Sequence, residues 1–340
     1  MLTSDILGEV FEYLDDRDEI LNSPTNFRDL YSCLLVNNQW CENVIPILWR
    51  SPFSRCYQRR GNLLIKTLIS CLNLSERQDL YNDGVFMPNG KYNIPLFNYP
   101  HFIRKLDYFQ LITLIKNWCR IYLEGSNEES VTAILRSVLR LFAKRHAYLN
   151  TLIIRSDDDL YCLLTEPEIL PILYPIRDLQ ISCYFPKKRL MNNLAKHCRN
   201  IISLQIMNLS IENDTSYNTA KKLALLIENQ RSLKSVVISK TKFINIIIPS
   251  LIKQKKTLRQ IIFRKLDFEG CGKLDFIKSC ARLENLDLVD CCNLNYPMIT
   301  SLVNHKNLKR AGVRNCLPAN VGDELRSWAN KINCRKRKYY

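Results

Sequence analysis

The sequence predicts an α/β repeat protein that begins with a short helical module. Two observations predict this class: apolar residues recur at helical spacing near the start of the chain, and from Leu149 onward a short apolar motif returns about every 25 residues. The expected parts are a trihelical module at 1–53, a helical connector at 54–148, a curved array of about seven units with a parallel sheet at 149–330, and a basic tail at 331–340.

The first part predicts three short helices. An apolar stripe runs along the first of them, after a start signal at Ser4 and Asp5, and consists of Ile6, Leu7, Val10, Phe11 and Leu14. Two further segments, divided near Asn37 and Asn38, share a second stripe of Leu30, Leu34, Cys41, Val44 and Leu48. About fifty residues cannot bury this many large side chains alone, so part of this surface should meet a partner.

The apolar positions of this part follow the order and spacing of a known module. They are Leu2, Asp5-Ile6-Leu7, Val10-Phe11, Leu14, Leu34-Leu35-Val36, Trp40 and Leu48-Trp49. The pattern resembles the F-box, a trihelical module that docks a substrate receptor onto the adaptor of an SCF-type, cullin-based ubiquitin ligase. The family usually begins with Leu-Pro, whereas this chain has Leu2-Thr3, and the segment from Arg17 to Arg28 is longer than the usual first connection. The resemblance implies adaptor contact, or its immediate support, by Leu2, Ile6, Leu7, Val10, Leu35, Val36, Trp40 and Trp49.

The connector predicts an all-helical block. Residues 61–72 form an apolar-rich helical segment, and a second amphipathic helix is expected between Glu128 and Leu149. Its aromatic residues lie among Leu and Ile at packing spacing, which favours a core over a cofactor site.

The repeat motif has the form apolar-x-x-apolar-x-apolar and occurs seven times. Its first positions are Leu149, Ile176, Ile201, Leu233, Leu258, Leu283 and Leu308, at intervals of 27, 25, 32, 25, 25 and 25 residues. We expect the irregular unit to place its excess in a surface loop at 208–218. We also expect Pro249 and Pro297 to lie in the first turns of returning helices.

The period and the L-x-x-L-x-L core resemble leucine-rich repeats. Cys280 and Cys291 around the sixth motif resemble the cysteine-containing subclass that often follows an F-box. The resemblance implies one short parallel strand and one returning helix in each unit.

Side chains between the core positions of each strand should lie on the exposed concave face, because side chains alternate along a strand. Ile153 and Ile262 belong to this row. We expect a protein substrate to bind there and at neighbouring basic positions, with candidates at Arg155, Gln180, Gln205, Lys253, Lys255, Lys256, Arg264, Asp287, Arg310 and Arg314.

Charge is distributed unevenly along the chain. The net charge of residues 1–50 is −6. Since the whole chain has a net charge of +16, the remaining 290 residues carry a net charge of +22. Ten basic residues and no Asp or Glu fall between Asn229 and Leu266, namely Arg231, Lys234, Lys240, Lys242, Lys253, Lys255, Lys256, Arg259, Arg264 and Lys265. This stretch is either a solvated basic face or a site for an acidic or phosphorylated protein; nucleic acid is a weaker alternative, since few aromatic residues accompany the cations.

Catalytic and metal-binding patterns are absent from the sequence. The four histidines are isolated, and nine glycines form neither a phosphate-binding loop nor a nucleophile elbow. Cys291-Cys292 lacks the spacing for a shared zinc ion. We therefore expect no cofactor, no metal and no enzymatic activity.

The cellular compartment follows from the N-terminus and the cysteines. Acidic residues interrupt the N-terminal apolar positions, which argues against a secretory signal and favours reduced thiols for the fourteen cysteines. No apolar run approaches the ~20 residues of a membrane span. We expect a cytoplasmic or nuclear protein, and Arg335-Lys336-Arg337-Lys338 is either a nuclear-import signal or a basic tail.

These observations together predict a non-catalytic substrate receptor of an SCF-type ligase. The F-box would bind the adaptor, and through it a cullin, while the repeat array would hold the protein to be ubiquitinated and degraded. The alternative is a leucine-rich-repeat scaffold that binds acidic protein or nucleic acid without ligase function, and the Leu2-Thr3 departure favours it.

Overall fold

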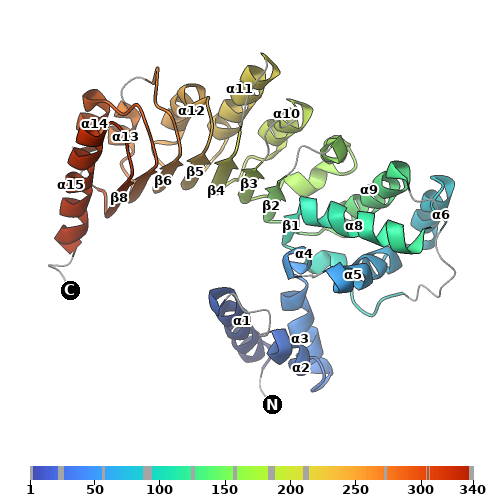
Figure 1. The fold of residues 1–340 in the computed structure, drawn as a ribbon. Helices are drawn as coiled ribbons and strands as arrows, with labels where there is room; N and C mark the ends of the chain where they lie inside the picture. The colour runs from blue at the N-terminus through green and yellow to red at the C-terminus, as the bar shows by residue number, and fades with distance from the viewer. Residues whose placement is uncertain are drawn as a thin grey trace. The chain divides into compact units, whose positions relative to one another are not determined.

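The computed structural model of the 340-residue chain divides into two compact units, Met1–Leu149 and Asn150–Tyr340 (Figure 1). The structure describes residues 3–21, 27–55, 58–86, 94–123, 127–155, 159–182, 188–209, 214–271, 274–303, 305 and 307–336. Leu2, for which we predict adaptor contact, lies outside these residues.

The first unit is mostly helical. Its elements are α1 (Ser4–Leu21), α2 (Phe27–Cys33), α3 (Asn38–Leu48), α4 (Pro52–Arg55), α5 (Gln58–Ser70), α6 (Leu74–Asn82), α7 (Tyr99–Phe102), β1 (Lys105–Asp107), α8 (Tyr108–Tyr122) and α9 (Glu128–Lys144). The expectation of an all-helical connector is wrong at β1. Asp107, the last residue of that strand, is also the N-cap of α8, and its carboxylate accepts a hydrogen bond from the Gln110 amide.

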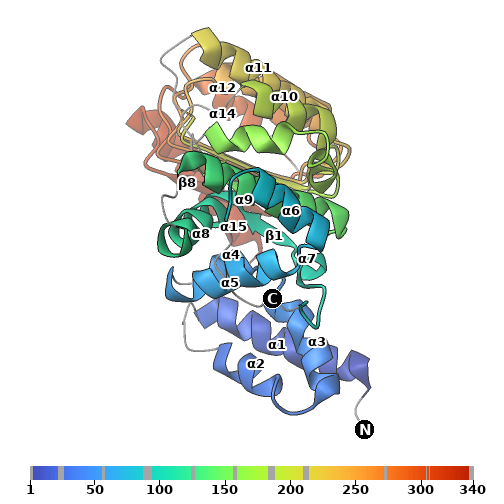
Figure 2. The same ribbon diagram turned by 90° about the vertical axis from the view of Figure 1, so that its right-hand side faces the viewer.

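Helices α1, α2 and α3 pack against one another as a three-helix module (Figure 2). Leu7 and Phe11, one turn apart on α1, lie in its buried core together with Leu30, Val44 and Ile47. The Asn37 side chain caps α3 by accepting a hydrogen bond from the Trp40 amide at 2.9 Å. This cap marks the start of α3, and the apolar residues of α3 then pack against those of α1 and α2.

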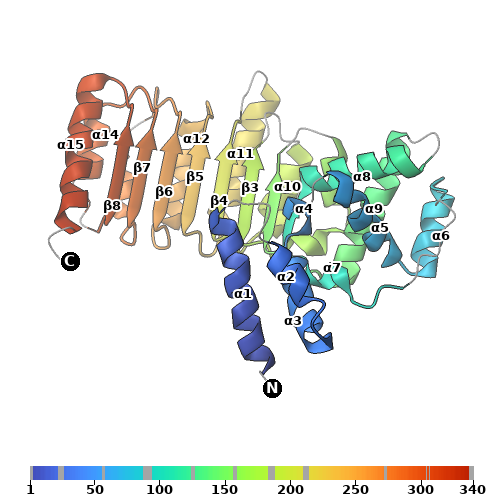
Figure 3. The same ribbon diagram turned by 60° about the horizontal axis from the view of Figure 1, so that its bottom comes forward.

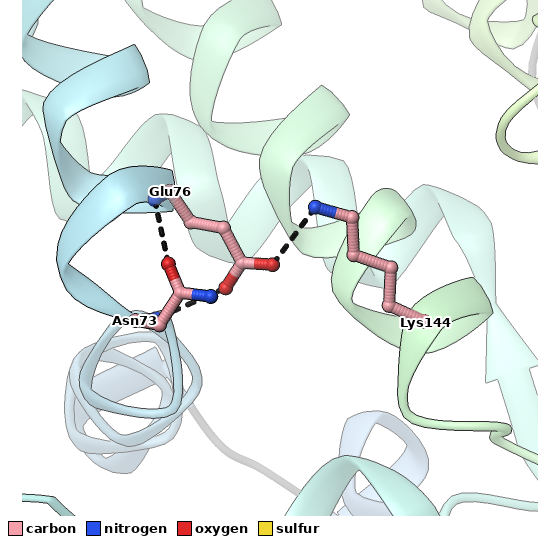
Figure 4. Close-up of polar contacts among 3 residues, drawn as sticks. All are labelled: Asn73, Glu76 and Lys144. Atoms are coloured by element: carbon pink, nitrogen blue, oxygen red, sulfur yellow. Dashed lines mark hydrogen bonds and ion pairs between the residues drawn. The ribbon is translucent and has the colours of Figure 1, made fainter.

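A capping box at the start of α6 includes the buried Glu76, which also connects α6 to α9 through Lys144 (Figure 4). The Glu76 amide donates to Asn73 Oδ1 at 2.8 Å, and the Asn73 amide donates to Glu76 Oε2 at 3.0 Å. The second carboxylate oxygen of Glu76 accepts from Lys144 Nζ at 3.0 Å. Burial acts to raise the pKa of Glu76, but the hydrogen bonds from Asn73 and Lys144 outweigh it and leave that pKa below its usual value.

The second unit alternates strands with helices. Its elements are β2 (Thr151–Ile154), the 3₁₀ helices η1 (Asp159–Thr165) and η2 (Leu170–Leu173), β3 (Asp178–Ser182), α10 (Lys188–His197), β4 (Ser203–Met207), α11 (Asp214–Glu228), β5 (Ser235–Ser239), α12 (Ile244–Leu251), the 3₁₀ helix η3 (Ile252–Gln254), β6 (Gln260–Arg264), α13 (Asp275–Ser279), β7 (Asn285–Val289), α14 (Tyr296–Val303), β8 (Arg310–Arg314) and α15 (Ala319–Lys336).

Strands β2 to β8 lie side by side in sequence order, all parallel (Figure 3). The second core position of each predicted motif is in register with that of the next, from Leu152 through Leu179 and Leu204 to Ala311. Helices α10 to α14 lie along one face of this sheet, and α15 lies beside β8 at its end (Figure 1). The prediction of a mixed α/β chain with a parallel sheet is confirmed.

Three local expectations are wrong. Helix α12 begins at Ile244, so Pro249 lies inside the helix instead of in its first turn. Helix α11 begins at Asp214, so the expected loop at 208–218 is helical over its last five residues. Helix α15 continues to Lys336, so most of the expected tail at 331–340 is helical.

Two buried glutamines connect neighbouring units. Gln230 Nε2 donates to the Cys198 carbonyl at 2.8 Å, and its Oε1 accepts from the Ile201 amide at 2.9 Å. In the next unit, Gln254 Nε2 donates to the carbonyls of Ile227 and Gln230 at 2.8 and 2.9 Å. These side chains supply hydrogen-bond partners to buried backbone groups of the helix-to-strand turns.

Candidate binding surfaces

The three-helix module exposes apolar side chains beside its core. Leu35 is 88% exposed and Val36 is 55% exposed in the turn between α2 and α3, while Ile6 and Val10 on α1 are 47% and 46% exposed. Four of the predicted adaptor-contact residues are therefore available to a partner. Leu7, by contrast, is buried in the module and belongs to its internal support.

The two predicted tryptophans are partly buried and pack within the first unit. The ring of Trp40 lies edge-on to Phe11 with the ring centres 5.2 Å apart, and Trp49 packs against Tyr99 at 4.3 Å. Arg50, next to Trp49, forms an ion pair with Glu12 of α1, and its carbonyl accepts from the amides of Arg104 and Lys105. The hydrogen bond from Arg50 lowers the pKa of Glu12.

One face of the sheet lies opposite the helices, and we call it the open face below. The first, third and fifth residues of each strand point to this face. Gln180, Gln205 and Asp287 lie there and are half-buried. The predicted arginines are exposed, at the ends of strands or directly after one: Arg155, Arg264, Arg310 and Arg314. Gly312 leaves space for the Asp287 carboxylate, since a side chain at that glycine would collide with it.

Ile153 and Ile262 depart from the expected exposed row. They are only 3% and 9% exposed, although they occupy the third position of their strands. Strand alternation sets the face to which a side chain points, but neighbouring side chains decide whether water reaches it. Ile262 is in register between Val237 and Asp287, whose side chains flank it.

The ten basic residues of the 229–266 stretch separate into two groups at opposite ends of the strands. Six exposed residues lie where the chain enters a strand, the strand-entry edge: Arg231, Lys234, Lys253, Lys255, Lys256 and Arg259. Four exposed residues lie at or just beyond the other end, the strand-exit edge: Lys240, Lys242, Arg264 and Lys265. A five-residue strand rises roughly 16 Å, so these groups do not form one site.

The backbone ladder aligns the entry-edge cations with others outside that stretch. The carbonyl of Lys234 accepts from the amides of Arg259 and Gln260 at 2.8 and 2.9 Å, and the carbonyl of Arg199 accepts from the Arg231 amide at 3.2 Å. Arg177 holds the equivalent entry position before β3, where its carbonyl accepts from the amides of Ile202 and Ser203. Sequence reasoning missed Arg177 and Arg199, although their positions relative to the repeat motif match those of Lys234 and Arg231.

Acidic residues are unequally distributed between the two edges. At the entry edge Glu284 lies between Arg259, at 3.8 Å, and Lys309, at 2.9 Å. At the exit edge Asp267 and Asp290 lie on the turns that follow β6 and β7, and they bond Asn293 and Asn315 at 2.6 and 3.0 Å. The exit edge is thus mixed in charge. The entry edge between β3 and β6 also carries Asp178 and Glu228, but cations outnumber them there.

Comparisons with known proteins identified no matching family model, no matching curated protein and no matching solved structure.

None of the helices in the described part of the chain combines the length and the apolar character of a membrane-spanning helix.

Proposed function

We propose that this protein is the substrate receptor of an SCF-type, cullin-based ubiquitin ligase, with residues 1–53 acting as an F-box and the second unit as a leucine-rich-repeat array. The exposure of Leu35 and Val36 carries the proposal. Both belong to the F-box-like pattern, and with the half-exposed Ile6 and Val10 they form an apolar surface beside the core of Leu7, Phe11, Leu30, Val44 and Ile47. An exposed apolar pair on a small folded module is typical of a protein interface.

The repeat-like second unit suits the other half of this role. Its strands are held in a continuous register, so the open face and the two edges present side chains at fixed spacing. The receptor would act by position alone, raising the effective concentration of a substrate lysine near the ubiquitin carrier. That role requires two binding surfaces and no nucleophile.

Adaptor binding is best tested with point variants. Deleting 1–53 would also remove Arg50 and the buried Phe53, which packs near Phe142 in the rest of the first unit. We would measure adaptor binding by calorimetry for the full-length protein and for Leu35→Asp/Val36→Asp. Leu96→Asp is the matched control, because Leu96 is also 88% exposed but lies outside the three-helix module.

Sub-micromolar binding that is lost in the double variant and kept in the control is the expected result. Absence of binding by the folded full-length protein would refute the proposal. It would favour the second candidate, a leucine-rich-repeat scaffold for acidic protein or nucleic acid without ligase function, which the basic entry edge supports.

A further inference from the structure

Six exposed cations form a continuous row across four neighbouring units at the strand-entry edge. They are Arg177, Arg199, Arg231, Lys234, Lys256 and Arg259, called the entry strip below. Their backbones belong to the sheet ladder or to the turns that lead into it, so their spacing is set by the roughly 4.8 Å between adjacent strands. The backbone of the strip is therefore prearranged, and only its side chains become ordered when a ligand binds.

Few carboxylates of the described residues neutralise this strip. Arg259 has Glu284 at 3.8 Å, and Asp178, next to Arg177 in the chain, is attracted to that arginine. Arg199, Arg231, Lys234 and Lys256 form no ion pair within the described part of the chain. Like charges at this spacing repel one another, and the sheet holds them in place. A polyanionic ligand would relieve that repulsion at each unit it crosses.

We propose that the entry strip binds an Asp/Glu-rich segment of a protein substrate. The inference rests on the proposed function, since it names the substrate class that the receptor would hold. The cations lie along a line and do not converge on one point, which matches carboxylates spread along a chain better than a single phosphate. A nucleic acid would also gain from stacking on aromatic side chains, and among the described residues of the turns that carry the strip only Tyr174 is a large exposed aromatic.

The strand-exit edge provides a matched control. Lys240, Lys242 and Lys265 are exposed and come from the same units, but Asp267 and Asp290 share that edge with them. Reversing three charges at either edge changes the net charge of the protein by the same amount. Only the position of the lost cations differs.

The test compares Arg231→Glu/Lys234→Glu/Lys256→Glu with Lys240→Glu/Lys242→Glu/Lys265→Glu in the full-length protein. Binding of a fluorescent Glu-rich peptide is measured by anisotropy at about 0.1 M salt, where long-range attraction is screened beyond about 10 Å. We expect the entry triple to weaken binding by about tenfold or more and the exit triple by about twofold or less. Circular dichroism and thermal unfolding of each variant establish that it remains folded.

Several outcomes would overturn the inference. Absence of peptide binding by the unmodified protein would do so, as would equal loss in both triples, because the attraction would then follow net charge alone. Tighter binding of a singly phosphorylated peptide without acidic residues, or of single-stranded DNA of equal charge, would show that the occupant is of another class. Adaptor calorimetry on the same samples tests the proposed function separately. If the adaptor does not bind, the peptide measurement still shows whether the entry strip binds an acidic segment.

Discussion

Among single side chains, Trp40 is where the core of the three-helix module meets its exposed surface. It is partly buried, and its ring packs edge-on against the fully buried Phe11. Trp40→Ala should therefore lower the free energy of unfolding by about 2–4 kcal/mol, because packing is lost inside the module. Urea unfolding of the full-length protein measures this. Leu35→Ala is the control and should change stability by about 0.5 kcal/mol or less. Unchanged stability of Trp40→Ala with lost adaptor binding would instead place Trp40 at the interface.

The cysteines differ sharply in their expected reactivity. Burial raises the pKa of Cys198 to about 12 and that of Cys280 to about 12, whereas Cys162 and Cys334 are exposed. The thiolate is the reactive form, so the two buried thiols should resist alkylation at neutral pH. Iodoacetamide followed by mass spectrometry should label Cys162 and Cys334 in the native protein and Cys198 and Cys280 only in urea. Labelling of Cys198 at the rate of Cys162 would contradict the buried arrangement.

Between elements of the second unit, buried amides stabilise the stacking of neighbouring turns. Gln254→Leu removes the buried donor that reaches the carbonyls of Ile227 and Gln230, and an apolar side chain takes its place beside them. We expect a loss of about 1–3 kcal/mol in unfolding free energy, measured by urea titration. Lys253→Leu adds the same side chain at the adjacent exposed position and should have little effect. A neutral result for Gln254→Leu would mean that water reaches these carbonyls.

The junction between α6 and α9 should give the first unit a measurable pH dependence. The pKa of Glu76 is lowered in the folded protein, so its contribution to stability is complete above the unfolded value of about 4.5 and is lost as pH falls through the folded value. The side-chain oxygen of Glu76→Gln can still accept the hydrogen bond from the Asn73 backbone amide, but the variant loses the charge opposite Lys144. Thermal unfolding between pH 3 and 7 should show a flatter profile for this variant, with a loss of roughly 1 kcal/mol near pH 7. Asp79→Asn, an exposed change on the same helix, should keep the original profile.

For the molecule as a whole, the parts predictable from the sequence are those that a periodic apolar pattern determines. The seven motifs from Leu149 to Leu308 each form a strand because their core positions can be buried only by stacking on the next unit. In the same way, the stripe through Leu7 and Phe11 defines the core of the first module. Burial at these positions depends on local spacing, which a linear pattern contains.

The positions of the basic residues and the long-range hydrogen bonds could not be predicted from the sequence, because they depend on how the chain turns between strands. The basic stretch from Arg231 to Lys265 reads as one feature, but its strands carry the residues to opposite edges. The backbone bond between Lys234 and Arg259, and the alignment of Lys234 with Arg177 through Ile202, follow from register across units of unequal length. Side-chain bonds such as those of Gln254 connect residues more than twenty positions apart, and no periodic signal marks them.

The last strand of the sheet, β8, has a neighbouring strand on one side only, so its other edge needs a different partner. On its other side Asn333 of α15 pairs with the backbone of Ala311: the Ala311 amide donates to Asn333 Oδ1 at 3.2 Å, and Asn333 Nδ2 donates to the Ala311 carbonyl at 2.8 Å. The amide side chain thus replaces a further strand at this position, and α15 covers an edge that could otherwise pair with a second copy.

Asn333→Leu should expose this pair of backbone groups. We expect a loss of about 1 kcal/mol in unfolding free energy, since water replaces the lost hydrogen bonds only in part. Sedimentation velocity at rising protein concentration should also reveal self-association, because β8 regains a free edge. Asn330→Leu places the same apolar side chain on an exposed position of α15 and controls for added hydrophobicity. Association of both variants alike would show that the new leucine is responsible, and a monomeric Asn333→Leu protein would show that the rest of α15 protects β8 without this amide.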